Sequence, residues 1–300
     1  MNKEKPVGEI KLVTRSMVIL FLLLFVVLAS SLGIKMGFTI IPSDAAVQFY
    51  NSIEALKPGD IVIFSIDHTR SSWPELGGAQ VAAVQHLKSK GAQIIFLGTT
   101  FVDCTNLYET ELRPYMEDKK IPYIYGTDYV YMGFYPGREA GAAELAKNMR
   151  LKIADVYGTS IEKLPLMMRV KTASDIALVI TSDDGSATIK CWILQWVTQY
   201  KTKVLSVAMA GGRVTLEPYR ISGQLAGLSA GVMGAAEYEV KLGKLGMGYS
   251  MLVAITLGSL YIIAVVIAGN IVYLVTKRTG QISKVGANKA VTNGSADNKR

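Results

Sequence analysis

"DIVIFSIDHTRSSWPEL", residues 60–76, carries the pattern on which the predicted fold rests. Its first seven residues are mostly apolar and β-branched and lack a regular polar alternation, which is typical of a strand buried on both faces. A helix is expected next, because Ser72 and Glu75 have the spacing of a capping box and the apolar residues after them recur at helical intervals. A strand followed by a helix is the repeating unit of an α/β fold.

The same alternation continues through residues 35–248. Parallel strands need connections of a dozen or more residues, and predicted helices fill the gaps between the predicted strands. We therefore expect one doubly wound, Rossmann-like α/β domain with a mostly parallel, five-stranded sheet, its halves joined by the irregular residues 153–174. The strands are predicted at 60–66, 92–98, 121–126, 175–181 and 203–209, and the helices at 72–90, 105–119, 137–152, 186–200 and from 213 onward.

Two apolar segments flank this domain. Residues 17–34 are 18 uncharged, mostly apolar residues and residues 250–276 are 27, and each is long enough to cross about 30 Å of hydrocarbon as a helix. The first segment has the alternative of a secretory signal, since Lys11 and Arg15 precede it and small residues follow. Its length favours a retained transmembrane helix.

Basic residues gather outside the predicted domain. The chain has a net charge of +8, of which residues 35–248 contribute +1, the N-terminal arm +2 and the tail from residue 277 +5. Lys and Arg flanking membrane spans favour the cytoplasmic side. We therefore predict a cytoplasmic arm at 1–16, an extracytoplasmic domain and a disordered basic cytoplasmic tail at 277–300. This distribution indicates the lipid bilayer as a partner and argues against nucleic acid.

Candidate functional residues follow the predicted strands. If the strand order is 3-2-1-4-5, the loops after the first and fourth strands flank the reversal of order, where ligands of open α/β sheets bind. Asp67, His68, Asp183 and Asp184 would then share one crevice. Acidic side chains with a histidine can hold a divalent cation or divide acid and base roles. Asp183 and Asp184 equally suit a helix N-cap, which needs no ligand.

Small residues at two helix starts offer a second kind of site. Backbone N–H groups there can bind an anion, although two glycines after a strand also make a simple tight turn. The residues concerned are Gly185, Ser186, Gly211, Gly212 and Arg213. The sequence has no Walker loop, GxGxxG or GxSxG motif, so it predicts no metal site and leaves any cofactor unknown.

The only cysteines are Cys104 and Cys191, and both lie in the predicted extracytoplasmic domain. A disulfide between them and two free thiols both stay open, because no CxxC pattern or Cys/His cluster accompanies them.

Glycines are concentrated in "SGQLAGLSAGVMGAAEYE", residues 222–239. As a helix this stretch would carry one face with almost no side-chain bulk, at a cost of about 1 kcal/mol per glycine. Close packing would offset that cost, against the sheet, a helix of the same domain or the same helix in a second subunit. The stretch is short for a third membrane span. The glycines of this face are Gly223, Gly227, Gly231 and Gly234.

This stretch, together with "SIDHTRSSWPEL" at 65–76, resembles an uncharacterised family of prokaryotic membrane proteins that have one α/β domain between two transmembrane helices. The resemblance covers most of residues 60–239 and implies the same architecture here. It brings no assigned activity. The chain departs from the family pattern at His68, where an aromatic residue is expected, and at Thr69, where a second acid is expected.

Two functions are compatible with these features. The first is a membrane-anchored, non-enzymatic extracytoplasmic module that binds a small ligand or a protein partner, with self-association through the glycine-rich stretch. The alternative is an envelope-associated hydrolase or transferase that uses Asp67 with Asp183 or Asp184.

Overall fold

The computed structural model describes residues 17–25, 28, 39–118 and 120–296. The chain divides into two units. One contains Gly33–Leu252, and the other contains residues up to Leu32 together with Val253–Arg300.

A six-stranded parallel sheet forms the centre of the first unit. Its strand order is β3-β2-β1-β4-β5-β6, so the order reverses between β1 and β4, as predicted for a doubly wound α/β domain. The strands are β1 (Ile61–Asp67), β2 (Gln93–Gly98), β3 (Tyr129–Phe134), β4 (Leu178–Asp183), β5 (Lys203–Ala208) and β6 (Gly227–Ala230).

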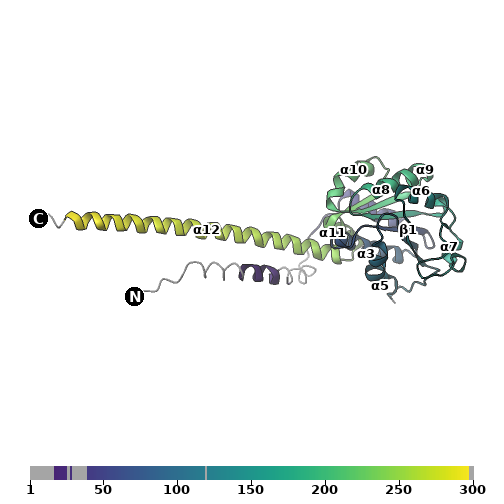
Figure 1. Ribbon diagram of the computed structural model, residues 1–300, viewed down its shortest axis with the longest axis horizontal. Coiled ribbons are helices and arrows are strands. Elements are labelled where there is room, and N and C mark those ends of the chain that lie inside the picture. Colours follow the sequence, from purple (N-terminus) through teal and green to yellow (C-terminus); the bar gives the residue numbers. More distant parts are fainter. Residues whose placement is uncertain (1–16, 26–27, 29–38, 119, 297–300) are drawn as a thin grey trace. The chain divides into compact units, whose positions relative to one another are not determined.

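Helices cover both faces of this sheet, with α6, α8 and α10 on one side and α3, α5 and α11 on the other (Figure 1). Along β1, Ile61 and Ile63 pack into one core, whereas Val62 and Phe64 pack into the other. A strand buried on both faces has no polar side, which is why its sequence lacks alternation.

The helices fall into two groups, one on each face of the sheet. The group on the first face is α6 (Glu139–Lys147), α7 (Pro165–Met168), α8 (Ala187–Trp192), the π-helical turn η5 (Ile193–Val197), α9 (Thr198–Tyr200) and α10 (Arg213–Ile221). The second is α2 (Asp44–Glu54), α3 (Trp73–Ser89), α4 (Cys104–Leu107), the π-helical turn η2 (Tyr108–Leu112), α5 (Arg113–Met116) and α11 (Gly231–Leu242).

Two strand predictions were wrong. The third strand is Tyr129–Phe134 rather than 121–126, because Gly126 adopts a φ of +85° and Asp128 accepts a hydrogen bond from the Ile124 N–H, which makes a turn of the predicted strand. The sheet also has six strands rather than five, since β6 lies inside the glycine-rich stretch.

The capping box predicted at the start of α3 is absent. A 3-10 turn (η1, Arg70–Ser72) leads directly into α3, so Ser72 has helical backbone angles and its side chain makes no cap hydrogen bond. Glu75 reaches across the sheet edge instead, where its Oε1 accepts from the Ala210 N–H at 2.6 Å.

The glycine-rich stretch is not one helix. Gly223 follows α10 with a φ of +78°, Gly227 begins β6, and only Gly231 and Gly234 lie in α11. Gly227, Gly231 and Gly234 pack closely within their own domain, whereas Gly223 has open space around it. A Cβ on Gly227 would meet the backbone N and Cα of Phe49 in α2 at 2.5 Å.

A long helix, α12 (Met247–Ala296), follows the domain, and its first residues up to Leu252 belong to the first unit. Met247–Ile271 is the one segment among the described residues that is long and apolar enough to cross a membrane, with a mean hydropathy of 2.6. Its large apolar side chains are about half exposed, for example Leu260 at 56% and Val266 at 55%. The helix continues through residues 277–296, where we expected a disordered tail. Each added residue gains a hydrogen bond without a new nucleation step.

The first predicted span, 17–34, lies only partly within the described residues. Residues 17–25 and 28 are helical, and residues 26–27 and 29–34 fall outside the described part. Within the second unit, the Tyr261 hydroxyl donates to the Val18 carbonyl at 3.2 Å and the rings of Phe25 and Tyr261 stack at 5.5 Å. The N-terminal helix therefore packs beside α12.

Candidate functional site

The residues of the predicted crevice lie where strand order reverses. Asp67 ends β1 and Asp183 ends β4, and the two are paired in the parallel register. Asp184 is within reach of the β1 loop, because the Thr69 hydroxyl donates to its Oδ2 at 3.4 Å. The sequence thus correctly predicted that these loops meet.

Asp67 is fully buried and its carboxylate holds neighbouring loops together. Oδ1 accepts from the Thr99 N–H at 2.5 Å, the Thr100 N–H at 2.8 Å and the Thr99 hydroxyl at 3.2 Å. Oδ2 accepts from the Ser65 hydroxyl. Burial raises the pKa of Asp67 to about 6 despite these four hydrogen bonds, which act in the opposite direction. A raised pKa suits a general acid, but an acid must reach its substrate, and this side chain has no exposed surface.

His68 is also buried and points into the domain. Its Nδ1 lies 2.9 Å from the Thr69 carbonyl, which can only accept, so Nδ1 carries the proton and Nε2 accepts from the Gln80 amide at 2.8 Å. Its ring stacks on Trp73 at 6.2 Å. Burial lowers the pKa of His68. Both ring nitrogens are therefore engaged by the protein.

Asp183 is the N-terminal partner of α8. Its Oδ1 accepts from the Gly185 N–H at 3.1 Å and its Oδ2 from the Thr188 N–H at 3.0 Å. This is the capping role that the sequence offered as one alternative, whereas the Ser186 side chain makes no cap hydrogen bond. Burial raises the pKa of Asp183. Asp184 is half-buried.

The second predicted group lies in the adjacent loop. Gly211 and Gly212 belong to a 3-10 turn (η6, Ala210–Gly212), and Arg213 begins α10. A Cβ on Gly212 would lie 3.1 Å from the Gly185 carbonyl, so the β4 and β5 loops approach closely there. Gly212 therefore permits close contact between the two loops, whereas Gly185 and Gly211 have open space around the position of a Cβ.

The carboxyl edge of the sheet is thus closed by hydrogen bonds. The Thr100 and Thr188 hydroxyls, 2.7 Å apart, add a further link between the loop after β2 and the beginning of α8. Within the described residues no three His, Cys, Asp or Glu side chains group as metal ligands. Cys104 is buried, Cys191 is half-buried, and both are free thiols.

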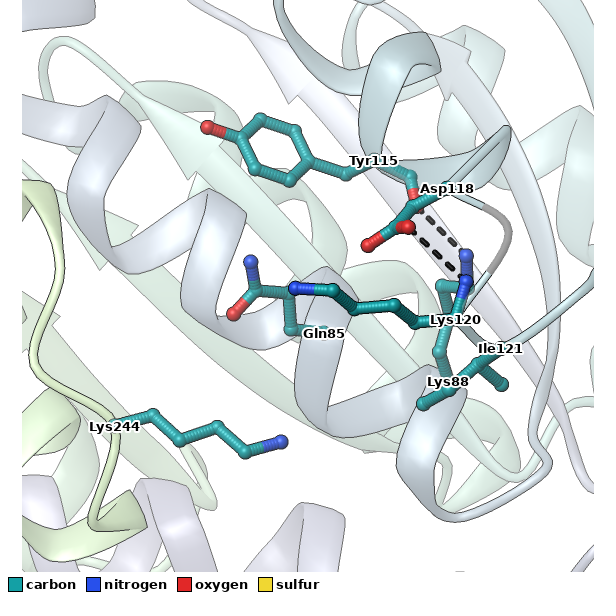
Figure 2. A pocket seen from close by; sticks show the side chains of 7 residues that line it. All are labelled: Gln85, Lys88, Tyr115, Asp118, Lys120, Ile121 and Lys244. Atoms are coloured by element: carbon teal, nitrogen blue, oxygen red, sulfur yellow. Dashed lines mark hydrogen bonds between the residues drawn. The ribbon is translucent and has the colours of Figure 1, made fainter.

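A cavity that the sequence did not predict lies beside α3 and α5. It measures about 270 Å³, and Figure 2 shows amines entering it from separate elements, Lys120 from the segment after α5 and Lys244 from the segment between α11 and α12. Lys88 is buried and donates to the Tyr115 carbonyl at 2.7 Å and the Met116 carbonyl at 3.0 Å. Burial lowers the pKa of Lys88. The lining residues are Gln85, Lys88, Tyr115, Asp118, Lys120, Ile121 and Lys244.

Isolated lysines give no sequence signal for such a cavity. Lys88 lies within a helix, and Lys120 and Lys244 are far apart in sequence and look like ordinary surface residues. Only the approach of α5 and the α11–α12 connection to α3 brings them together.

No family model, curated protein or solved structure matches this chain. The fold is therefore assigned from the topology of the sheet alone. The resemblance to two-span membrane proteins remains an expectation from the sequence.

Proposed function

We propose that this chain is a membrane-anchored α/β module whose domain lies outside the cytoplasm and binds a small anionic ligand in the cavity of Figure 2. The observation that carries the proposal is the meeting of three lysines, Lys88, Lys120 and Lys244, with a single carboxylate, Asp118, around about 270 Å³ of open space. The excess positive charge favours an anion, and lysine is a common phosphate ligand.

The buried Lys88 amine supports an anion in particular. Two of its three N–H donors serve backbone carbonyls, and removal from water makes its charged form costly. A bound anion would offset that cost. Lys120 and Lys244 are exposed at the cavity and free to approach a ligand, and Gln85 offers an amide donor.

The membrane anchor rests on α12 and on the N-terminal helix beside it. Lys244 lies three residues before Met247, where the apolar segment begins. The proposed ligand is a phosphate-bearing compound, either free in solution or as the headgroup of an anionic lipid. The distribution of Lys and Arg favours cytoplasmic termini with the domain on the opposite side.

The contacts of Asp67 and Asp183 support this proposal over the enzymatic alternative. The oxygens of Asp67 and Asp183 are occupied by hydrogen bonds that hold the loops of the sheet edge, and both side chains are buried. Gly227, Gly231 and Gly234 pack against their own domain, whereas Gly223 has open space around it. Self-association through the glycine-rich stretch is therefore not part of this proposal.

Binding can be measured by calorimetry on the full chain in nanodiscs of neutral lipid. We expect glycerol phosphate to bind, and the double variant Lys120→Met/Lys244→Met to bind it about tenfold or more weakly, because hydrogen bonds to charged groups contribute about 1.5–3 kcal/mol. Lys147→Met, on α6, removes an exposed lysine away from the cavity and serves as the control. Nanodiscs with anionic lipid separate the two sources: a headgroup ligand would compete with glycerol phosphate there. Equal affinity of the double variant and the control would refute the site.

Topology has its own test. A membrane-impermeant maleimide added to intact cells should label Lys147→Cys and spare Ser295→Cys, both in a background with Cys191→Ser. The opposite labelling pattern would invert the proposed orientation. Replacement of both Asp67 and Asp183 by Asn with full retention of function in cells would end the enzymatic alternative.

A further inference from the structure

A second cavity, separate from the lysine site, is walled by tyrosines. It measures about 210 Å³, which is below the roughly 300–1,000 Å³ of drug-sized sites, so its ligand must be small. The rings come from η2, from the turn before β3 and the start of β3, and from the segment between α6 and α7. The lining residues are Tyr108, Arg113, Glu117, Tyr125, Tyr129 and Tyr157.

The rings stand roughly at right angles to one another. Tyr125 meets Tyr129 edge-on at 5.2 Å with an angle of 86°, and meets Tyr157 at 5.3 Å with an angle of 72°. The Tyr108 ring stacks on the Tyr131 ring, with 4.1 Å between the ring centres. Mutually perpendicular aromatic faces around a small space are the arrangement that encloses an organic cation.

The outer rings are fixed before any ligand arrives. The Tyr125 hydroxyl donates to Asp155 Oδ2 at 2.6 Å, and the Tyr157 hydroxyl donates to Glu109 Oε1 at 2.5 Å. Asp155 is itself held by the backbone N–H groups of Tyr157 and Thr159. Fixed walls reduce the ordering cost of binding.

One polar group in this cavity lacks a partner. The Tyr108 hydroxyl is buried and makes no hydrogen bond to any described residue, although Tyr108 lines the cavity. Burial raises the pKa of Tyr108, and the nearby Tyr157, Tyr129, Tyr125 and Glu109 raise it further. A buried hydroxyl without a partner is costly, and a ligand atom that bonds to it would remove the cost.

The charges around the rings favour a positive ligand. Glu109, Glu117 and Asp155 surround the cluster, whereas Arg113 is its one lining cation. Arg113 is held by Glu109 Oε2 and Glu117 Oε1, each at 2.7 Å, and its guanidinium lies 5.7 Å from the centre of the Tyr157 ring. The Arg113 guanidinium therefore already lies over the Tyr157 ring, and the three carboxylates still outnumber this one positive charge.

We propose that this tyrosine cavity binds a small methylated ammonium compound, with the ammonium against the rings of Tyr125 and Tyr129 and a polar group of the ligand bonded to the Tyr108 hydroxyl. The inference is independent of the lysine site, because the two cavities share no residue and have opposite charge preference.

Choline is the probe for this proposal, and 3,3-dimethylbutan-1-ol is its uncharged counterpart of the same shape. Calorimetry uses the full chain in a maltoside detergent, which contains no ammonium group. We expect choline to bind and the alcohol to bind at least about tenfold more weakly, because the attraction of a ring face requires the charge. Equal affinities, or no choline binding with a Kd below ~10 mM, would overturn the proposal.

Variants at the cavity mouth locate the binding. Tyr157→Leu removes an exposed ring and should weaken choline binding several-fold, whereas Tyr157→Phe keeps the ring and should bind nearly as the parent does. Tyr108→Phe removes only the unpartnered hydroxyl, and it should weaken choline binding without lowering the melting temperature. Lys120→Met/Lys244→Met should leave choline binding unchanged. Unchanged binding in Tyr157→Leu and Tyr108→Phe would contradict the site even if choline binds elsewhere.

Discussion

Replacing Asp67 by asparagine tests whether this carboxylate is a structural group that costs stability when ionised. In the folded protein burial raises the pKa of Asp67 from 3.8 to about 6. A group whose folded pKa lies above its unfolded value contributes stability that is fully present below the unfolded pKa and lost as pH rises through the folded pKa. The loss from this residue should therefore occur between about pH 4 and pH 6.

The size of the effect follows from the shift. At about 1.4 kcal/mol per pKa unit, a rise from 3.8 to about 6 corresponds to about 3 kcal/mol. The side chain is fully buried, so solvent does not screen this cost. An asparagine side chain at this position keeps the geometry, because its Oδ1 can accept from Thr99 and Thr100 and its amide can donate to the Ser65 hydroxyl.

The assay is thermal unfolding of the full chain in detergent from pH 4 to pH 8. The stability of Asp67→Asn minus that of the parent should rise by about 3 kcal/mol across the interval, which is about 6–12 °C in Tm for a domain of this size. Above the folded pKa the difference should be constant.

Asp183→Asn is the matched control. Both Asp183 oxygens accept backbone N–H groups, and an amide can replace only one of them, so this variant should be destabilised across the whole range by about 1–3 kcal/mol. A difference between Asp67→Asn and the parent that is flat with pH, or that grows toward low pH, would refute the reasoning, because hydrogen bonding would then dominate burial at Asp67.

Three further outcomes follow from the packing and burial of single side chains. Gly227→Ala should lower the free energy of unfolding by about 1–3 kcal/mol or more, because the added Cβ meets the Phe49 backbone. Gly211→Ala has open space around the added Cβ and should be neutral or slightly stabilising. Urea unfolding of both variants measures the difference. Glu239→Gln should lower the free energy of unfolding by about 1–3 kcal/mol, because the Glu239 carboxylate accepts the N–H groups of Gly246, Gly248 and Tyr249. A melting temperature no lower than that of the parent would contradict this. A maleimide should modify Cys191 in the folded protein and Cys104 only after unfolding, and mass spectrometry of labelled peptides distinguishes the two.

The sequence predicted the layers of the fold because burial on both faces leaves a clear pattern. The strands at 60–66, 92–98, 175–181 and 203–209 each correspond to an observed strand within a few residues, close to the usual uncertainty of element boundaries. Residues 121–126 were predicted as a strand because the run is aromatic and apolar. Such a run also suits a turn when it ends in a glycine with positive φ, as it does at Gly126. The short strand β6 was missed because its glycine reads as helix packing until Phe49 is placed against it.

The sequence predicted where the candidate site residues lie better than it predicted what their side chains contact. Strand order alone brings Asp67 and Asp183 to one edge, so their proximity was predictable. The hydrogen bonds of Asp183 at the start of α8 fit the N-cap alternative, whereas those of Asp67 depend on the loop backbone after β2, which no sequence pattern specifies. The two cavities were missed for a related reason, since each combines residues from three segments whose spacing in the sequence carries no period.

The two stretches on which we based the expected family resemblance, residues 65–76 and 222–239, lie close together in the fold. Glu75 of the first segment accepts from Ala210 beside Gly231 of the second, where a Cβ on Gly231 would lie 3.1 Å from Glu75 Oε1. Further along, a Cβ on Gly78 in α3 would meet the Gly248 backbone at 2.7 Å, so α3 lies directly against the beginning of α12.

Glu239 completes this junction. It lies at the end of the second segment, it is buried, and it accepts N–H groups from the first residues of α12 and the turn before it. A carboxylate at a helix N-terminus stabilises that helix end. Glu239 and the close packing at Gly78 therefore hold the first turn of the membrane-crossing candidate against α3 and α11. The position of this helix start on the domain thus depends on a buried carboxylate and on glycines that let backbones approach closely.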